Sequence, residues 1–109
     1  MNQKTDCIFC KIIEGTAPAD IVYRDDMVTA FMDINPINPG HVLVIPNVHT
    51  PGLEGLPEAY GKYLFNAAQE LAAALRRTDL EPDGVNLILA DGAAAGQEVF
   101  HLHMHVLAR

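Results

Sequence analysis

The chain has 109 residues, half of them hydrophobic, and a formal net charge of −7 at pH 7. This length and composition predict one folded domain, residues 1–109, and exclude a disordered chain. The acidic balance argues against nonspecific binding to nucleic acid, which needs a basic surface. Because no apolar run approaches ~20 residues and no secretory signal pattern is present, we expect a cytoplasmic protein with no membrane partner.

The N-terminal region combines a tail with the only two cysteines of the chain. Residues 1–6 are predicted to form a flexible tail, and Cys7 to Gly15 a short helix. Cys7 and Cys10 form a Cys-x-x-Cys motif, which in a cytosolic chain is more often metal-binding or redox-active than a structural disulfide. A thioredoxin-like motif would follow a strand in a βαβ unit, and that pattern is absent. Two cysteines alone supply only half of a tetrahedral zinc site.

Four strands are predicted ahead of the C-terminal segment, over residues 20–24, 27–33, 41–46 and 85–90. The first two are typical of a hairpin with its turn at Arg24, Asp25 and Asp26. The third is a near-continuous apolar run, which indicates a strand buried on both faces. His41 and His49 lie at its two ends.

One long helix is predicted over residues 57–77. Pro57 and Glu58 suit its first turn, and Arg76 and Arg77 suit the negative end of the helix dipole. Its alanines are expected to serve close packing on a sheet. Apolar side chains recur with the helical period at Tyr60, Leu64, Ala67, Ala68, Leu71 and Leu75.

Within the C-terminal segment, residues 98–107, apolar side chains and histidines alternate strictly from Phe100 to Val106. This pattern predicts a half-buried strand with His101, His103 and His105 on one face. On a regular strand the outer two histidines would lie about 13 Å apart, too far to share one metal ion. The polar face of a strand can carry a histidine without function, but three in register favour three separate roles.

The loop before this segment, residues 91–98, is rich in glycine. Gly92 and Gly96 allow tight turning and close backbone approach, which phosphate-binding loops need. Because the loop leads directly to histidines that can act as nucleophiles or move protons, the residues indicate phosphoryl or nucleotidyl transfer.

These motifs together resemble the histidine triad (HIT) family, from about Cys7 to the C-terminus. The motifs are Cys7-Ile8-Phe9-Cys10, Ala30-Phe31-Met32-Asp33-Ile34, Gly40-His41-Val42-Leu43-Val44-Ile45-Pro46, His49, Gly96-Gln97 and His101-Leu102-His103-Met104-His105-Val106-Leu107. The resemblance implies an α+β fold with a five-stranded antiparallel sheet, one long and one short helix. It also implies a homodimer with a continuous sheet, whose interface we expect on the long helix and its neighbouring strand. The implied chemistry is nucleotide hydrolysis or transfer through a nucleotidyl-histidine intermediate, without an organic cofactor.

Each site residue takes its role from this resemblance. His103 would be the nucleophile, His105 would contact the phosphate and leaving group, and His101 would support them. Asp33 would bind the ribose, with His41 near the site. The base would be walled by Ile8, Phe9, Ile12, Phe31 and Ile34, and the α-phosphate would be bound by Gly96, Gln97 and Glu98 with loop amides.

The resemblance further implies a structural zinc ion on Cys7, Cys10, His49 and His101. The alternative is that the two cysteines are buried small apolar residues without a metal. Two positions depart from the family pattern: Ala90 replaces an amide residue common in the family, and Glu98 replaces Ser or Thr.

Within the family, the chain resembles the prokaryotic Hint-like group, which hydrolyses phosphoramidates of purine nucleotides such as AMP or GMP. The alternatives are a Fhit-like dinucleoside polyphosphate hydrolase and a nucleotide-binding dimer with little turnover.

Overall fold

The computed structural model describes residue 4 and residues 6–109. The flexible tail predicted for residues 1–6 therefore lies mostly outside the described residues, although the N–H of Lys4 lies 3.4 Å from Sγ of Cys10 and donates to it. No described helix is long and apolar enough to cross a bilayer. The elements are helix α1 (Ile8–Glu14), strands β1 (Ile21–Arg24), β2 (Val28–Met32) and β3 (His41–Pro46), helix α2 (Glu58–Leu75), strand β4 (Val85–Leu89), the 3₁₀ turn η1 (Ala93–Ala95) and strand β5 (Met104–Ala108).

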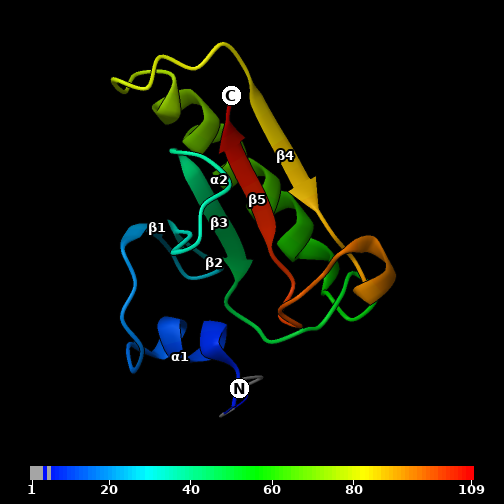
Figure 1. The fold of residues 1–109 in the computed structure, drawn as a ribbon. Helices are drawn as coiled ribbons and strands as arrows, with labels where there is room; N and C mark the ends of the chain where they lie inside the picture. Colours follow the sequence, from blue (N-terminus) through cyan, green and yellow to red (C-terminus); the bar gives the residue numbers. More distant parts are fainter. Residues whose placement is uncertain (1–3, 5) are drawn as a thin grey trace.

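The strands form one antiparallel sheet, which confirms the predicted α+β class. Within the described residues the sheet has five strands in the order β1-β2-β3-β5-β4. Figure 1 shows β3 and β5 side by side, with α2 behind them and α1 at the end of the sheet where β3 finishes. β1 and β4 are the two edges, so the histidines of β3 and β5 lie in the middle of the sheet.

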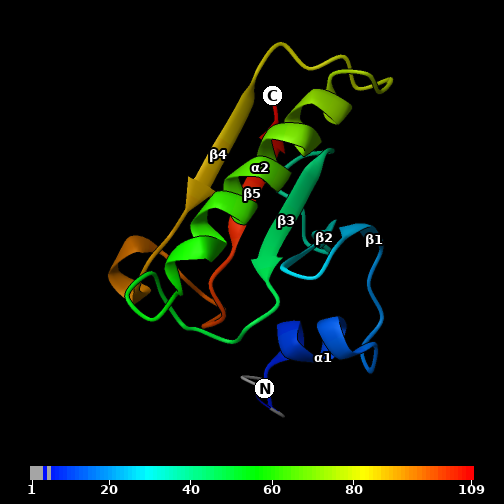
Figure 2. The ribbon, with the colours of Figure 1, turned by 180° about the vertical axis from the view of Figure 1, so that it is seen from behind.

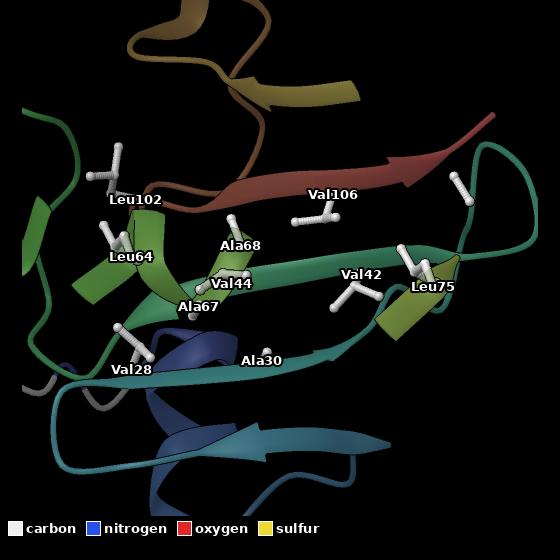
Figure 3. Close-up of a cluster of buried hydrophobic side chains, with 11 residues drawn as sticks. Val28, Ala30, Val42, Val44, Leu64, Ala67, Ala68, Leu75, Leu102 and Val106 are labelled. Carbon is white, nitrogen blue, oxygen red and sulfur yellow. The ribbon is translucent and has the colours of Figure 1, made fainter. Parts of the chain in front are cut away.

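Helix α2 covers one face of the sheet, as the reverse view in Figure 2 shows. Its apolar stripe buries Leu64, Ala67, Ala68 and Leu75, and the two alanines let the helix lie close to the strands. Each buried leucine contributes about 1.5–3 kcal/mol relative to an exposed one. Figure 3 shows this core, in which the helix meets Val28, Ala30, Val42, Val44, Leu102 and Val106.

Helix α1 packs on the opposite face, against Phe31, Leu43 and Ile45. Because side chains alternate along a strand, Val42 and Val44 face α2 while Leu43 and Ile45 face α1. All six residues of β3 are buried, so the prediction of a strand buried on both faces is confirmed.

The predicted strand over residues 98–107 is wrong in its first part, because β5 contains only Met104–Ala108. The preceding backbone pairs with the loop after β3 instead: the N–H of Leu102 donates to the Thr50 carbonyl at 2.8 Å. His101, Leu102 and His103 are all buried, whereas Phe100, expected on the apolar face, is 47% exposed. The residues alternate in type but not in burial.

Gly40, directly before β3, is required by both conformation and space. Its φ is +85°, and an added Cβ would lie 2.8 Å from Cβ of Ala108 and 2.8 Å from Cδ1 of Leu80. We expect Gly40→Ala to lower the free energy of unfolding by about 2 kcal/mol, through left-handed strain and overpacking. Gly61 is a matched control, because it lies within α2 with no atom within 4 Å of an added Cβ. Gly61→Ala should stabilise by about 0.5–1 kcal/mol. Urea denaturation checks both; equal effects would contradict the assignment for Gly40.

Candidate active site and metal site

The triad segment is held against the loop that follows β3. The backbone hydrogen bond from Leu102 to Thr50 is one contact. In a second contact, Nε2 of His101 lies 2.9 Å from the Pro46 carbonyl oxygen. Since a carbonyl only accepts, Nε2 of His101 carries the ring proton and Nδ1 presents a lone pair. This lone pair faces Cys7, the residue before α1, and Cys10 of α1, so His101 belongs to the metal site described below.

His103 is fixed in the orientation that a nucleophile needs. Its Nδ1 lies 2.8 Å from the carbonyl oxygen of His101, to which it donates, so Nε2 carries the lone pair. The ring of Phe9 packs edge-to-face against it, with ring centroids 5.2 Å apart. His103 is only 6% exposed, so a main-chain carbonyl and an apolar wall restrict it to one tautomer and one orientation.

His105 and His41 form a hydrogen-bonded pair on the same face of the sheet. The N–H of Ile37 donates to Nδ1 of His41 at 3.2 Å, which leaves the ring proton of His41 on Nε2. The Nε2–H of His41 donates to Nδ1 of His105, and the two nitrogens are 2.8 Å apart. Oδ2 of Asp33 lies 3.5 Å from the same Nε2 atom. The remaining proton of His105 is therefore on Nε2. Burial lowers the pKa of both histidines, so both rings are neutral near pH 7.

Asp33 lies between the histidine pair and the surface. Its Oδ1 accepts the N–H of Asn35 at 2.9 Å, and its side chain is 19% exposed. Oδ2 keeps acceptor capacity for a further donor such as a ribose hydroxyl.

The apolar residues predicted to wall a base divide into two groups. Phe9 and Ile12 of α1 and Phe31 of β2 are buried between the helix and the sheet, and the rings of Phe9 and Phe31 pack edge-to-face with centroids 5.4 Å apart. Ile8 is 49% exposed and Ile34 is 87% exposed. The buried group can form only the floor of a base site, and the exposed pair supplies the surface that a base could cover.

The loop predicted to bind phosphate is held in shape by Gln97. Its Oε1 accepts the N–H of Gly92 at 2.7 Å, and its two amide hydrogens go to the carbonyls of Pro51 and Val99 at 2.6 and 3.0 Å. The Gln97 side chain is thus occupied and not free to donate to a phosphate. Gly92 and Gly96 have φ angles of +101° and +97°, which only glycine adopts readily.

The free donors of this loop are main-chain groups. The N–H groups of Glu98 and Val99 have no acceptor among the described residues. Phosphate-binding loops bind phosphate oxygens through successive main-chain N–H groups of this kind. Phosphate binding is therefore available from the backbone, with Gln97 as the residue that positions it.

The four predicted zinc ligands gather at one place between α1, the loop after β3 and the triad segment. All four ligand atoms of Cys7, Cys10, His49 and His101 lie within 4.8 Å of one another. Sγ of Cys10 lies 3.3 Å from Nδ1 of His49, and Nδ1 of His101 lies 3.5 Å from Sγ of both Cys7 and Cys10. Tetrahedral zinc with ordinary bond lengths implies sulfur–nitrogen separations of about 3.5 Å. The residues therefore fit a zinc ion.

The electrostatics of this cluster suit a neutral zinc complex. Burial raises the pKa of the Cys10 thiol to about 11 and lowers the pKa of His101 to about 4. These buried groups thus resist carrying an uncompensated charge. Zn²⁺ with two thiolates and two neutral imidazoles has no net charge. The Pro46 carbonyl, which fixes the His101 tautomer, is the outer-sphere partner such a ligand needs.

A second cluster, Asp33, His41 and His105, also places its ligand atoms within 4.8 Å of one another. Its two histidine nitrogens share a proton at 2.8 Å, and the other nitrogen of His41 accepts the N–H of Ile37. Because these ring nitrogens are already engaged in hydrogen bonds, we interpret this cluster as a hydrogen-bond network and not as a metal site.

Sequence reasoning missed the main-chain groups that set these orientations. The carbonyls of Pro46 and Thr50 hold the triad segment, the Pro51 carbonyl holds the Gln97 side chain, and the N–H of Ile37 holds His41. Every residue carries such groups, so no side-chain pattern indicates them.

The geometry can be set beside known proteins. A model of the HIT domain matches residues 14–109. The structure of a Zn-bound histidine triad family protein from Mycobacterium smegmatis matches with a TM-score of 0.92 and 41% identity, over 95% of this chain and 75% of that one. The purine nucleoside phosphoramidase of Escherichia coli is 40% identical over 102 residues, 94% of this chain and 86% of that protein. The adenylylsulfatase HINT3 of Arabidopsis thaliana is 39% identical over 106 residues, 97% of this chain and 53% of that protein.

Fold and site together define an α+β protein of the histidine triad type. The chain belongs to the HIT family. At the level of the family, it is a nucleotide hydrolase.

Proposed function

We propose that the chain hydrolyses nucleoside phosphoramidates or related purine nucleotide conjugates, such as those of AMP or GMP, at the α-phosphate. The observation that carries the proposal is the His103 ring, whose Nδ1–H is tied to the His101 carbonyl so that Nε2 presents its lone pair. A neutral imidazole held in this way is a nucleophile that costs little to orient. The names of the Escherichia coli and Arabidopsis relatives support nucleotide conjugates as the substrate class.

In the first step, Nε2 of His103 forms a bond to phosphorus and the bond from phosphorus to the amine breaks. The amine leaves as the neutral species after taking one proton. His105, with its proton on Nε2, donates a hydrogen bond to the phosphate or leaving atom, and His41 maintains that tautomer. The N–H groups of Glu98 and Val99 bind phosphate oxygens.

In the second step, water adds to phosphorus and the bond to Nε2 of His103 breaks. The water gives up one proton, which balances the proton taken by the amine. The two steps together consume one water and release the nucleotide. Asp33 binds the ribose in both steps, and Ile8 and Ile34 cover the base.

In this proposal a zinc ion is held by Cys7, Cys10, His49 and His101 and has a structural role. With four protein ligands it leaves no open position for substrate. It would link α1 to His101, two residues before the nucleophile. Both cysteines are free thiols, which suits the reducing cytoplasm that we propose as the location; cell fractionation tests this.

We also propose that two copies pair through β4 and α2. β4 is an edge strand on which Leu87 and Ile88 are 40% and 43% exposed, and Phe65 of α2 is 54% exposed. An apolar sheet edge exposed to solvent invites pairing with another strand. Light scattering at micromolar concentration should give the mass of two chains; the mass of one chain would rule out the dimer.

The function is tested by measuring AMP release from adenosine 5′-phosphoramidate and from diadenosine polyphosphates by chromatography. The phosphoramidate should have the higher kcat/KM. Faster cleavage of the dinucleotide would assign the chain to the Fhit-like alternative. Binding of AMP by calorimetry without turnover of either compound would make the chain a nucleotide-binding protein.

A further inference from the structure

The two cysteines of the metal site differ in their access to solvent. Cys10 is fully buried, whereas Cys7 is 9% exposed and lines a cavity of about 330 Å³. His49 also lines this cavity, and the side chains of Ile8 and Phe100 in its walls are 49% and 47% exposed, so the cavity opens to solvent. A molecule of a few atoms, such as a peroxide, can therefore reach the sulfur of Cys7 but not that of Cys10.

The two sulfur atoms are also close to each other. They lie within 4.8 Å, and the N–H of Cys10 donates to Sγ of Cys7 at 3.4 Å. Cys7 lies before the first helical residue, with an extended backbone at φ −94° and ψ 121°. A disulfide has a sulfur–sulfur distance of about 2.0 Å, whereas two thiolates on one tetrahedral zinc ion lie about 3.8 Å apart. A Cys7–Cys10 disulfide and a bound zinc ion therefore exclude each other.

Phe9 connects this cysteine pair to the proposed nucleophile. It lies between the two cysteines in the sequence, and its ring packs edge-to-face on the rings of His101 and His103, with centroids 5.9 and 5.2 Å apart. Phe9 is also one of the buried residues through which α1 rests on the sheet. Loss of the link between the cysteines and His101 would therefore loosen α1 and withdraw the apolar wall that orients His103.

We propose that Cys7 is an oxidation site and that the Cys7–Cys10 pair is a redox switch, which a peroxide turns off by joining the two sulfurs. The disulfide ends the contacts of both sulfurs with the histidine ligands, so a bound zinc ion is released and α1 loosens. The resulting loss of hydrolysis rests on the proposed function. The disulfide itself does not.

The oxidation proceeds in two steps. First, the sulfur of Cys7 forms a bond to one peroxide oxygen, the oxygen–oxygen bond breaks and hydroxide leaves, which gives a sulfenic acid. Second, the thiolate of Cys10 attacks the sulfur of Cys7, so that the sulfur–sulfur bond forms, the sulfur–oxygen bond breaks and a second hydroxide leaves. The two thiolates lose two electrons and the peroxide gains them. Two protons from the solvent convert the two hydroxides to water.

Treatment of the zinc-loaded protein with a small excess of hydrogen peroxide tests the inference. The intact chain should lose the mass of two hydrogens relative to the reduced, metal-free chain, zinc should pass to a chromogenic chelator, and hydrogen exchange should become faster in Ile8–Glu14. AMP release from adenosine 5′-phosphoramidate should fall by about tenfold or more, because the nucleophile is no longer held in position. A thiol reductant followed by zinc should restore every readout, which oxidation of methionine would not allow.

Two matched variants show which sulfur reacts first. Cys7→Asp and Cys10→Asp each remove one thiol and keep an oxygen ligand for zinc. Dimedone, a reagent for sulfenic acids, should label Cys7 in Cys10→Asp and should leave the fully buried Cys10 unlabelled in Cys7→Asp. Cys7→Asp should also keep its zinc in peroxide. Equal labelling of the two variants would contradict the assignment of Cys7.

The measurements on the unmodified chain do not depend on the folding of either variant. A chain that forms no disulfide in peroxide would overturn the inference, as would a disulfide that leaves the hydrogen exchange of α1 unchanged. If the reduced chain releases no AMP, the proposed function fails. Disulfide formation with faster exchange would then still support the switch.

Discussion

His103→Ala is expected to reduce AMP release from adenosine 5′-phosphoramidate by roughly 10⁴-fold or more, since the nucleophile itself is removed. No other histidine can replace it in the observed arrangement: Nε2 of His101 is bound to the Pro46 carbonyl, and Nδ1 of His105 accepts from His41. AMP should still bind, because the loop N–H groups and Asp33 are unchanged. Turnover by rapid quench and AMP binding by calorimetry measure the two effects separately.

Asp33→Ala is the matched control for this variant. Ribose contacts are made in both the ground state and the transition state, so losing one should raise KM and leave kcat within about tenfold of the unmodified chain. Mass spectrometry of quenched reactions should detect a nucleotidyl adduct in the unmodified chain and none in His103→Ala. Near-normal turnover in His103→Ala would contradict the covalent mechanism.

The sequence predicted most of the fold because two of its periodicities are strong. The apolar run of β3 indicates burial on both faces, and the stripe of α2 indicates one helix on one face; both are confirmed. The C-terminal alternation was misleading. Such a pattern indicates that the chain is extended, but it does not indicate which segment pairs with its backbone. For His101 to His103 that partner is the loop after β3, held by the Thr50 carbonyl.

The candidate site was less predictable than the fold. Resemblance to the family indicated which histidines matter, but their tautomers depend on main-chain groups of Pro46, His101 and Ile37. The Gln97 side chain illustrates the same limit: its residue type suits phosphate binding, yet its three hydrogen bonds to backbone make it a support for the loop. Side-chain chemistry can be read from a sequence, whereas competition for a side chain by nearby backbone cannot.

Zinc removal is expected to have the largest effect on stability. The ion would join Cys7 and Cys10 of the N-terminal segment to His49 and His101, which are distant in the sequence, and so fix α1 on the sheet. Binding to the folded state alone stabilises it, and loss of a structural zinc should cost about 3 kcal/mol or more. For a domain of this size that corresponds to a melting temperature lower by roughly 12 °C or more.

Cys10→Ser is the variant that tests this, because Cys10 is fully buried and contacts both histidine ligands at 3.3 and 3.5 Å. Protein purified without a histidine tag or chelator should contain close to one zinc per chain by elemental analysis, and Cys10→Ser should contain almost none. A strong chelator should lower the melting temperature of the unmodified chain to that of the variant, and should not change the variant further. The chelator experiment separates loss of the metal from the packing cost of the substitution.

Hydrogen exchange should become faster mainly in Ile8–Glu14, the helix that the zinc would hold. Metal-free protein with an unchanged melting temperature would instead show that the two cysteines are packed as small apolar residues.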